Sequence, residues 1–144
     1  MPSAVLDSTI LVSAFLTPGG AADAVLHGGM EDRFLCYLAA ESIVETTRRL
    51  LAPRLQQRYA YTAADAEVFA ITLRASFTVF SDLPPLSGIV RDPNDDMILA
   101  CAVAAAAEYV VTRDLDLLSL DTYAGIAIVT PEAFLALLRG LETA

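Results

Sequence analysis

The stretch SAVLDSTILVSAFL, residues 3–16, decides the fold expected for this chain. Its first part, residues 3–7, is short and apolar and ends in Asp7, which is typical of a buried β-strand. Its second part, residues 9–16, predicts a helix, which the sequence PGG at 18–20 ends. A buried strand followed at once by a helix is the repeating unit of an α/β fold.

The same alternation continues along the chain. Further strands are expected at 33–38, 77–80, 108–112 and 126–130. Further helices are expected near Ala21, at 39–52, at 62–75 with a capping-box-like start at Thr62 and Asp65, at 93–107, and from Pro131 onward. Apolar strands that alternate with helices predict a three-layer α/β/α fold with a central, mainly parallel sheet. We expect the whole chain, residues 1–144, to form a single domain.

The composition is that of a folded chain, since 56% of the residues are hydrophobic. The longest uninterrupted apolar run covers the eleven residues 97–107, which is too short to cross a bilayer. The N-terminus lacks the basic region and cleavage pattern of a secretory signal, so we expect a cytoplasmic protein with no membrane segment. Cys36 and Cys101 lie in apolar segments and are expected to be reduced core residues.

The charge of the chain argues against several classes of protein. Nine basic and eighteen acidic residues give a formal net charge of −9, which argues against a basic protein that coats nucleic acid. All nine basic residues are arginine. The absence of lysine argues against response-regulator receivers and haloacid-dehalogenase-type phosphatases, whose sites use a lysine, and against P-loop proteins, which need G-K-[ST].

Acidic residues gather where the ligands of α/β folds bind, at the carboxyl ends of the predicted strands. They are Asp7 after the first strand, Asp114 and Asp116 after the strand at 108–112, Asp96 in the first turn of a helix, and Glu45 within another helix. Carboxylates that converge cannot all stay ionised unaided, so they bind protons or cations. Oxygen ligands select a hard cation, Mg²⁺ or Mn²⁺. A zinc site is not expected, because His27 is the only histidine.

These acids also have structural explanations. Asp92 precedes a proline and is typical of an N-cap, and Asp95 and Asp96 in the first helical turn would favour the helix dipole. We assign Asp92 and Asp95 to these structural roles at the start of the helix. Asp114 or Asp116 would cap a short helix, and Asp7 would begin a turn. Both interpretations stay open for each residue taken singly. That all of them should fall at strand ends by chance is much less probable.

Four segments resemble the PIN-domain family in their order and spacing. They read VLDSTILVSAFLTPGG, LAAESIVETTRRLLAPRL, RDPNDDMILACAVAAAAEYVVTRDLDLL and IVTPEAF, and they cover nearly the whole chain. Within the family they resemble the VapC-like toxin components of toxin–antitoxin pairs. There, a first-strand Asp, a helical Glu, the Asp of D-x-x-[IL]-A and the Asp of T-x-D form the metal site. The resemblance places that site at Asp7, Glu45, Asp96 and Asp114, with Asp116 as an accessory residue.

The chain departs from the family pattern at two positions. The family commonly has D-T-N at the first strand, whereas this chain has Asp7, Ser8 and Thr9. Thr9 can still donate a hydrogen bond to a carboxylate, but it lacks the reach of an amide. Met97 stands where relatives often carry a lysine, which removes one contact with phosphate.

The resemblance implies a metal-dependent endoribonuclease that hydrolyses phosphodiester bonds of RNA, with Mg²⁺ or Mn²⁺ as cofactor. The catalytic residues that it implies are Asp7, Glu45, Asp96 and Asp114. The metal ligands that it implies are Asp7, Asp96, Asp114 and Asp116, with Thr9 and Thr112 in support. The alternative is a catalytically weak or inactive PIN-like module that binds RNA or protein.

Partners follow from the same resemblance. We expect an RNA substrate, a cognate antitoxin protein and a homodimer. The arginines nearest to each other in the sequence are Arg48, Arg49, Arg54 and Arg58. They are candidates for contacting the RNA backbone, because arginine forks match phosphate, and they fit equally well on the solvated face of a helix.

Overall fold

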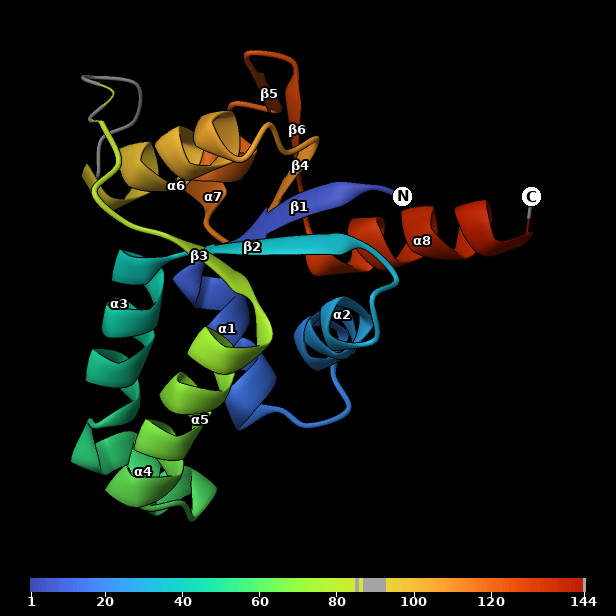
Figure 1. Ribbon diagram of the computed structural model, residues 1–144. Coiled ribbons are helices and arrows are strands. Elements are labelled where there is room, and N and C mark those ends of the chain that lie inside the picture. The colour runs from blue at the N-terminus through green and yellow to red at the C-terminus, as the bar shows by residue number, and fades with distance from the viewer. Residues whose placement is uncertain (85, 87–92, 144) are drawn as a thin grey trace.

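The computed structural model describes residues 1–84, 86 and 93–143 (Figure 1). Within these residues six strands form one sheet in the order β3-β2-β1-β4-β6-β5. Their bounds are β1 (Ser3–Leu6), β2 (Leu35–Ala39), β3 (Thr78–Phe80), β4 (Tyr109–Val111), β5 (Thr122–Tyr123) and β6 (Ile126–Val129). Only the β5–β6 pairing is antiparallel among them. The predicted central, mainly parallel sheet is confirmed.

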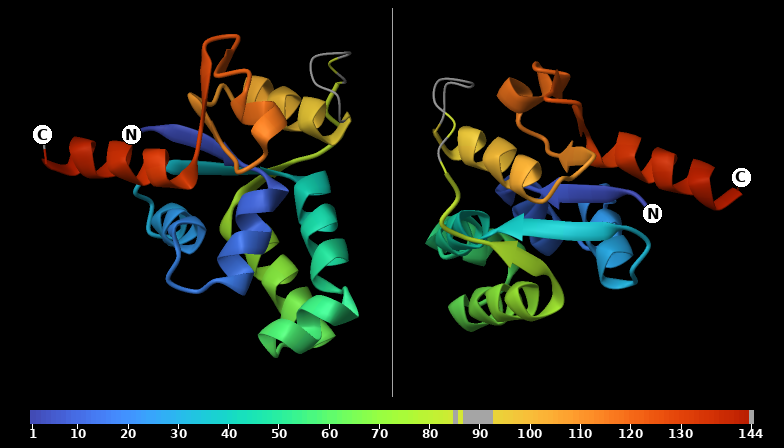
Figure 2. Two further views of the ribbon diagram at one scale, coloured as in Figure 1. Left: turned by 180° about the vertical axis from the view of Figure 1, so that it is seen from behind. Right: turned by 45° about the horizontal axis from the view of Figure 1, so that its top comes forward.

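Helices cover both faces of this sheet, as Figures 1 and 2 show. Their bounds are α1 (Ser8–Leu16), α2 (Ala21–Met30), α3 (Ala40–Leu50), α4 (Pro53–Tyr59), α5 (Ala63–Ser76), α6 (Pro93–Ala104), α7 (Leu115–Leu118) and α8 (Pro131–Thr143). Side chains of α1, α2, α3, α5 and α8 share one buried cluster with the sheet, and side chains of α6 and α7 share another. The three-layer α/β/α architecture is therefore confirmed.

The strands contribute side chains to both clusters, because successive side chains of a strand point to opposite faces of the sheet. In β1, Ala4 and Leu6 belong to the cluster on the α1 side, and Val5 belongs to the cluster on the α6 side. All three side chains are fully buried. A strand buried on both faces reads as a continuous apolar run, which is why β1 shows no polar alternation in the sequence. This burial fixes the point at which β1 ends and Asp7 begins the next segment.

The structure differs from the sequence predictions at a few boundaries. The helix α4 was not expected, because the proline at 53 was taken only as the end of the preceding helix. Pro53 instead opens a new helix, a position where its missing N–H is no loss. The helix expected at 93–107 ends at Ala104, and Ala106 adopts a left-handed conformation with φ of 52° that turns the chain into β4. The short antiparallel strand β5 was also not expected.

Other local predictions are confirmed. Thr62 and Asp65 form a reciprocal capping box at the start of α5: the Asp65 N–H donates to Thr62 Oγ1 at 3.2 Å, and the Thr62 N–H donates to Asp65 Oδ2 at 2.9 Å. Asp114 caps the short helix α7 and accepts from the Asp116 N–H at 2.8 Å. Asp92, assigned to capping from the sequence, lies outside the described residues.

In the part of the chain that the structure describes, no single helix combines the length and apolar character needed to cross a bilayer. The pair formed by α1 and α2, bent by 104°, meets that criterion by length and composition only.

The two cysteines are core residues. Cys36 lies in β2 at 8% exposure, Cys101 lies in α6 at 0%, and both are free thiols. Burial raises the pKa of Cys36 far above that of an exposed thiol. Burial, with a smaller contribution from the negative charge of Glu41, raises the pKa of Cys101 to about 12.

We expect neither thiol to react with Ellman's reagent in the folded protein at about pH 8, since the thiolate is the reacting species. Both should react once the chain is unfolded in denaturant. The measurement is the absorbance of the released thionitrobenzoate, before and after denaturant is added. Rapid release from the folded protein would contradict the burial described above.

Candidate active site

The candidate site begins where β1 and β4 end side by side. The chain proceeds from β1 to β2 on one side, while β4 lies on the other side of β1. The connections therefore diverge at this point, which leaves a crevice at the carboxyl ends of these two strands. Asp7 follows β1 directly, and Thr112 and Asp114 follow β4. The sequence segments that carry the acids are thus brought together by the strand order.

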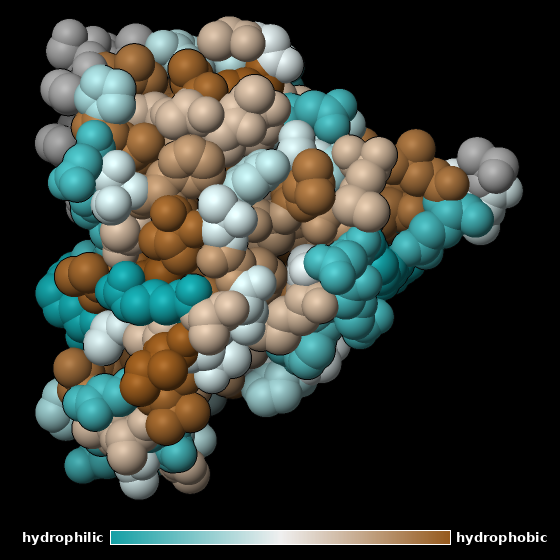
Figure 3. Space-filling view, viewed as in Figure 1, coloured by the Kyte–Doolittle hydropathy of each residue, from teal (hydrophilic) through white to brown (hydrophobic). Residues whose placement is uncertain are grey.

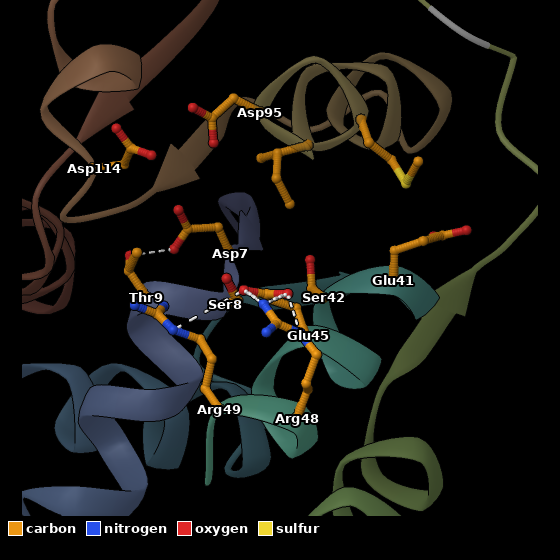
Figure 4. A pocket seen from close by; sticks show the side chains of 12 residues that line it. Asp7, Ser8, Thr9, Glu41, Ser42, Glu45, Arg48, Arg49, Asp95 and Asp114 are labelled. Atoms are coloured by element: carbon orange, nitrogen blue, oxygen red, sulfur yellow. Dashed lines mark hydrogen bonds and ion pairs between the residues drawn. The ribbon is translucent and has the colours of Figure 1, made fainter. Parts of the chain in front are cut away.

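A cavity of about 370 Å³ opens at this crevice (Figure 4). Its charged lining residues are Asp7, Glu41, Glu45, Asp95, Asp114, Arg48 and Arg49. In Figure 4, Asp7, Asp95 and Asp114 lie on one side of it, while Glu45, Arg48 and Arg49 come from α3 on the other. The cavity therefore has an aspartate wall and a wall of mixed charge.

Asp7 is the most tightly held of these acids, with an exposed fraction of 3%. Thr9 Oγ1 donates to Asp7 Oδ1 and Thr112 Oγ1 donates to Asp7 Oδ2, each at 2.5 Å. The direction of each hydroxyl group is fixed by a second hydrogen bond, which its oxygen accepts from the backbone. Thr9 Oγ1 accepts from the Arg113 N–H at 3.0 Å, and Thr112 Oγ1 accepts from the Asp114 N–H at 2.9 Å. Each hydroxyl has one proton, so each delivers it to Asp7.

The burial of Asp7 also sets its acidity. Desolvation raises the pKa of its carboxyl group above the ordinary value. The hydrogen bonds from Thr112, Thr9 and the Ile10 N–H oppose that rise, and the nearby charge of Asp114 adds to it. A positive charge placed in the cavity would favour the ionised form of this buried acid.

Three other carboxylates approach one another beside Asp7. One oxygen each from Asp95, Asp114 and Asp116 lies within 4.8 Å of the others. Asp95 is buried in the first turn of α6, Asp114 is half-buried and Asp116 is exposed. The three carboxylates therefore extend from the buried side of the crevice to its exposed side.

Asp96, predicted as a ligand, is buried at 9% exposure, but it is not among the residues that line the cavity. Its neighbour Asp95, which was assigned to the helix dipole, lines the cavity instead. Successive residues of an α-helix project about 100° apart, so only one of the two can face the crevice directly. Nothing in the sequence indicates that Asp95 lines the cavity, because the spacing of the apolar residues around it does not fix the rotation of α6.

Glu45 lines the cavity but pairs with arginine rather than joining the aspartates. Arg48 Nη2 lies 2.7 Å from Glu45 Oε2 and 2.8 Å from Oε1, and Arg49 Nε lies 4.0 Å from Oε1. The Glu45 side chain is half-buried between neighbours that differ in exposure. Ile43 is fully buried, whereas Val44 is 58% exposed, and the Glu45 side chain retains 26% of its exposure.

The other predicted arginines lie elsewhere. Arg54 and Arg58 are exposed on α4 and do not line the cavity. Arg58 stacks on its neighbour Tyr59, with 5.4 Å between the guanidinium carbon and the ring centre. Of the four arginines predicted to contact RNA, the structure brings Arg48 and Arg49 to the crevice.

Comparison with known families identifies this arrangement. The family model described as PIN domain matches residues 3–116, a span that runs from β1 through α7 and includes every residue of the cavity. The chain belongs to the PIN-domain family. A comparison with curated proteins found no match.

Solved structures with the same fold include proteins of toxin–antitoxin systems. VapBC2 from Rickettsia felis, solved with a promoter DNA fragment, shares 10% identity at a TM-score of 0.60, with 88% of this chain and 96% of that chain covered. VapC20 from Mycobacterium tuberculosis shares 13% identity at 0.57, covering 86% and 98%. PAE2754 from Pyrobaculum aerophilum shares 20% identity at 0.64, covering 96% and 90%. At these identities the likeness establishes the PIN fold and no more.

The acids of this PIN domain fit a divalent cation, which PIN nucleases use. Asp95, Asp114 and Asp116 supply oxygen donors close enough to share one ion, and carboxylate oxygens are the donors that hard cations prefer. Asp7 adds a buried carboxylate on the same wall, already oriented by two threonines. The group of acids can therefore hold a divalent metal.

The threonine contacts predict a loss of stability on substitution. Thr112→Val keeps the shape of the side chain but removes the donor to Asp7 and the acceptor of the Asp114 N–H. We expect a loss of about 1–3 kcal/mol in the free energy of unfolding, because a buried acid loses a partner. Urea denaturation followed by circular dichroism measures it.

Thr47→Val is the matched control. The Thr47 hydroxyl donates to a backbone carbonyl of its own helix, Ile43 O, at 2.9 Å, so its removal leaves no buried acid without a donor. We expect a change within about 0.5 kcal/mol. Equal losses for the two substitutions would contradict the role given to Thr112.

Proposed function

We propose that this protein is a metal-dependent endoribonuclease that hydrolyses phosphodiester bonds of RNA. The observation that carries the proposal is the convergence of Asp7, Asp95, Asp114 and Asp116 at the strand-order switch of a PIN domain. These residues come from three separate parts of the chain. If each acid only capped a helix or began a turn, nothing would require these residues to lie close together.

The proposed chemistry divides the work among the residues of the crevice. A divalent cation, when bound, supplies the positive charge that polarises the phosphodiester and activates the attacking water. Asp95, Asp114 and Asp116 hold that cation, and Asp7 contributes its carboxylate from the buried side. Thr9 and Thr112 keep Asp7 in one orientation. Glu45 lies at the opposite wall. Once its carboxylate is released from Arg48 and Arg49, it orients the attacking water.

RNA is the substrate class that the resemblance and the structural neighbours favour. VapC20 is described as a toxin that cleaves the sarcin–ricin loop, and this supports RNA rather than a small phosphate ester as the substrate. The PIN fold shared with VapBC2 supports a partner antitoxin for this chain as well. We accordingly propose that it acts as the toxin of a toxin–antitoxin pair.

An apolar surface supports the proposal of a protein partner. Figure 3 shows hydrophobic side chains gathered over α5, where Val68 and Ile71 are 60% and 66% exposed. A second cavity beside them is lined by residues that include Phe15, Tyr61 and Phe69. Apolar groups of this size at a surface favour association with another protein, either an antitoxin or a second copy of the chain.

Metal binding is tested by thermal unfolding with and without Mg²⁺ or Mn²⁺. A ligand present at ten times its dissociation constant stabilises by about 1.4 kcal/mol, which corresponds to a rise of about 3–6 °C in Tm for a chain of this size. We expect the rise in the unsubstituted protein and its loss in Asp95→Asn and Asp114→Asn.

Asp96→Asn is the matched comparison for Asp95→Asn, since it removes the same charge from the next residue. The resemblance favours Asp96 as the ligand, whereas the cavity favours Asp95. We expect Asp96→Asn to keep at least part of the metal response. No response in the unsubstituted protein would contradict the metal proposal, and loss of it in Asp96→Asn alone would move the site to Asp96.

Activity is tested by incubating the purified protein with total RNA, with and without Mg²⁺, beside Asp7→Ala. We expect cleavage only with the metal and a loss of at least about a hundredfold in Asp7→Ala, a typical effect of removing a metal-site acid. Denaturing gel electrophoresis resolves the products. Binding of RNA without cleavage would favour the alternative of an inactive binding module, and equal cleavage by Asp7→Ala would point to a contaminating nuclease.

A further inference from the structure

The α3 wall of the cavity holds two arginines, paired with Glu45, to which the proposed chemistry gives no role of their own. Glu45, Arg48 and Arg49 all line the cavity, and Figure 4 shows the Glu45 carboxylate lying among the arginine side chains. Arg48 approaches it with two donors: Nη2 at 2.7 Å and Nε at 3.2 Å from Oε2. Both of these donors meet one oxygen, and Nη2 also lies 2.8 Å from Oε1, so the guanidinium group contacts both oxygens of the carboxylate. Arginine can contact two oxygens of a phosphate with the same donors.

We propose that Arg48 and Arg49 form a phosphate subsite, and that Glu45 occupies it as an internal competitor until the RNA backbone displaces it. The identification of the ligand as an RNA phosphate rests on the proposed function. The subsite itself rests on the geometry of α3. Displacement turns Glu45 back toward the cavity, where its carboxylate becomes available to the reaction.

The ion pair is weak enough to exchange. The side chains of Arg48 and Arg49 are 70% and 45% exposed. For ion pairs at such exposed positions, the equilibrium favours the paired over the unpaired state by only a few-fold. All three residues lie on one helix at i, i+3 and i, i+4 spacings, so exchange requires rotation of side chains and no movement of the backbone. A phosphate that offers the same two-oxygen geometry can therefore replace the carboxylate.

The charges that line the cavity give a reason for the pairing of Glu45 with the arginines. Among the residues that the structure describes, five carboxylates line the cavity, from Asp7, Glu41, Glu45, Asp95 and Asp114, against two arginines. Glu45 holds them on α3 in the absence of substrate. The arrangement thus keeps the anion-binding and cation-binding sides of the cavity apart.

The test is the affinity of a fluorescein-labelled single-stranded RNA oligonucleotide, measured by fluorescence anisotropy at low ionic strength. EDTA is present so that the RNA stays intact and no metal contributes to binding. The proteins are the unsubstituted chain, Glu45→Gln, Arg48→Gln/Arg49→Gln, and the variant with all three substitutions. Glu41→Gln is the matched control, since Glu41 lies on the same cavity wall one turn earlier and its removal changes the charge equally.

We expect Glu45→Gln to tighten binding by about two- to fivefold, the strength of an exposed ion pair. Glu41→Gln should tighten it less, through its charge alone. In the Arg48→Gln/Arg49→Gln background, binding should weaken and Glu45→Gln should have no more effect than Glu41→Gln has. Equal effects of the two glutamate substitutions in the unsubstituted background, or the same gain from Glu45→Gln with and without the arginines, would overturn the subsite.

The outcome is separable from that of the proposed function. If the protein cleaves no RNA in Mg²⁺ but the coupling between Glu45 and the arginines holds, the subsite stands and the nuclease proposal falls. If the protein cleaves RNA and the coupling is absent, the nuclease proposal stands and the subsite falls. Failure of every variant to bind the oligonucleotide also overturns the subsite.

Discussion

The hydrogen bonds that Thr9 and Thr112 donate to Asp7 hold the site together. Asp7 lies at the end of β1, and Thr112 lies 105 residues later at the end of β4. The Thr112 contact joins the ends of β1 and β4 at the point where the chain diverges to either side of the sheet. A buried carboxylate without donors would be costly, because its charge would face an apolar surrounding. The threonines reduce that cost and at the same time fix where the carboxylate points.

This arrangement gives each hydroxyl a defined direction. Both threonine oxygens accept a backbone N–H from the segment after β4, from Arg113 and Asp114 respectively. That segment also carries the carboxylates of Asp114 and Asp116. The loop that supports Asp7 from behind is therefore the loop that supplies two of the other acids. The Arg113 side chain forms an ion pair of 2.8 Å with Glu132 of α8. The loop is therefore attached to the sheet on one side and to α8 on the other.

The cavity also offers the proposed RNA substrate a way to approach a strongly acidic chain. The net charge of −9 would repel RNA if it were spread evenly over the surface. The aspartates of one wall give a cation a place to bind, and the α3 wall carries arginines. Opposite charges on facing walls allow a phosphodiester to be approached by positive charge from both sides. On the α3 wall itself, Glu45 pairs with Arg48 and Arg49.

The sequence alone determined the fold class and the approximate place of the site. Buried strands such as β1 read as continuous apolar runs, and acids after such strands must meet at one edge of a parallel sheet. Local signals with fixed spacing, such as the capping box of Thr62 and Asp65, were equally readable. Only the tertiary structure decided that Asp95 rather than Asp96 faces the cavity, because the rotation of α6 is set by packing along its whole length. It alone decided that Thr112 reaches Asp7, since that contact depends on strands that lie far apart in the chain. The pairing of Glu45 with Arg48, by contrast, has the i, i+3 spacing of neighbours on one helix.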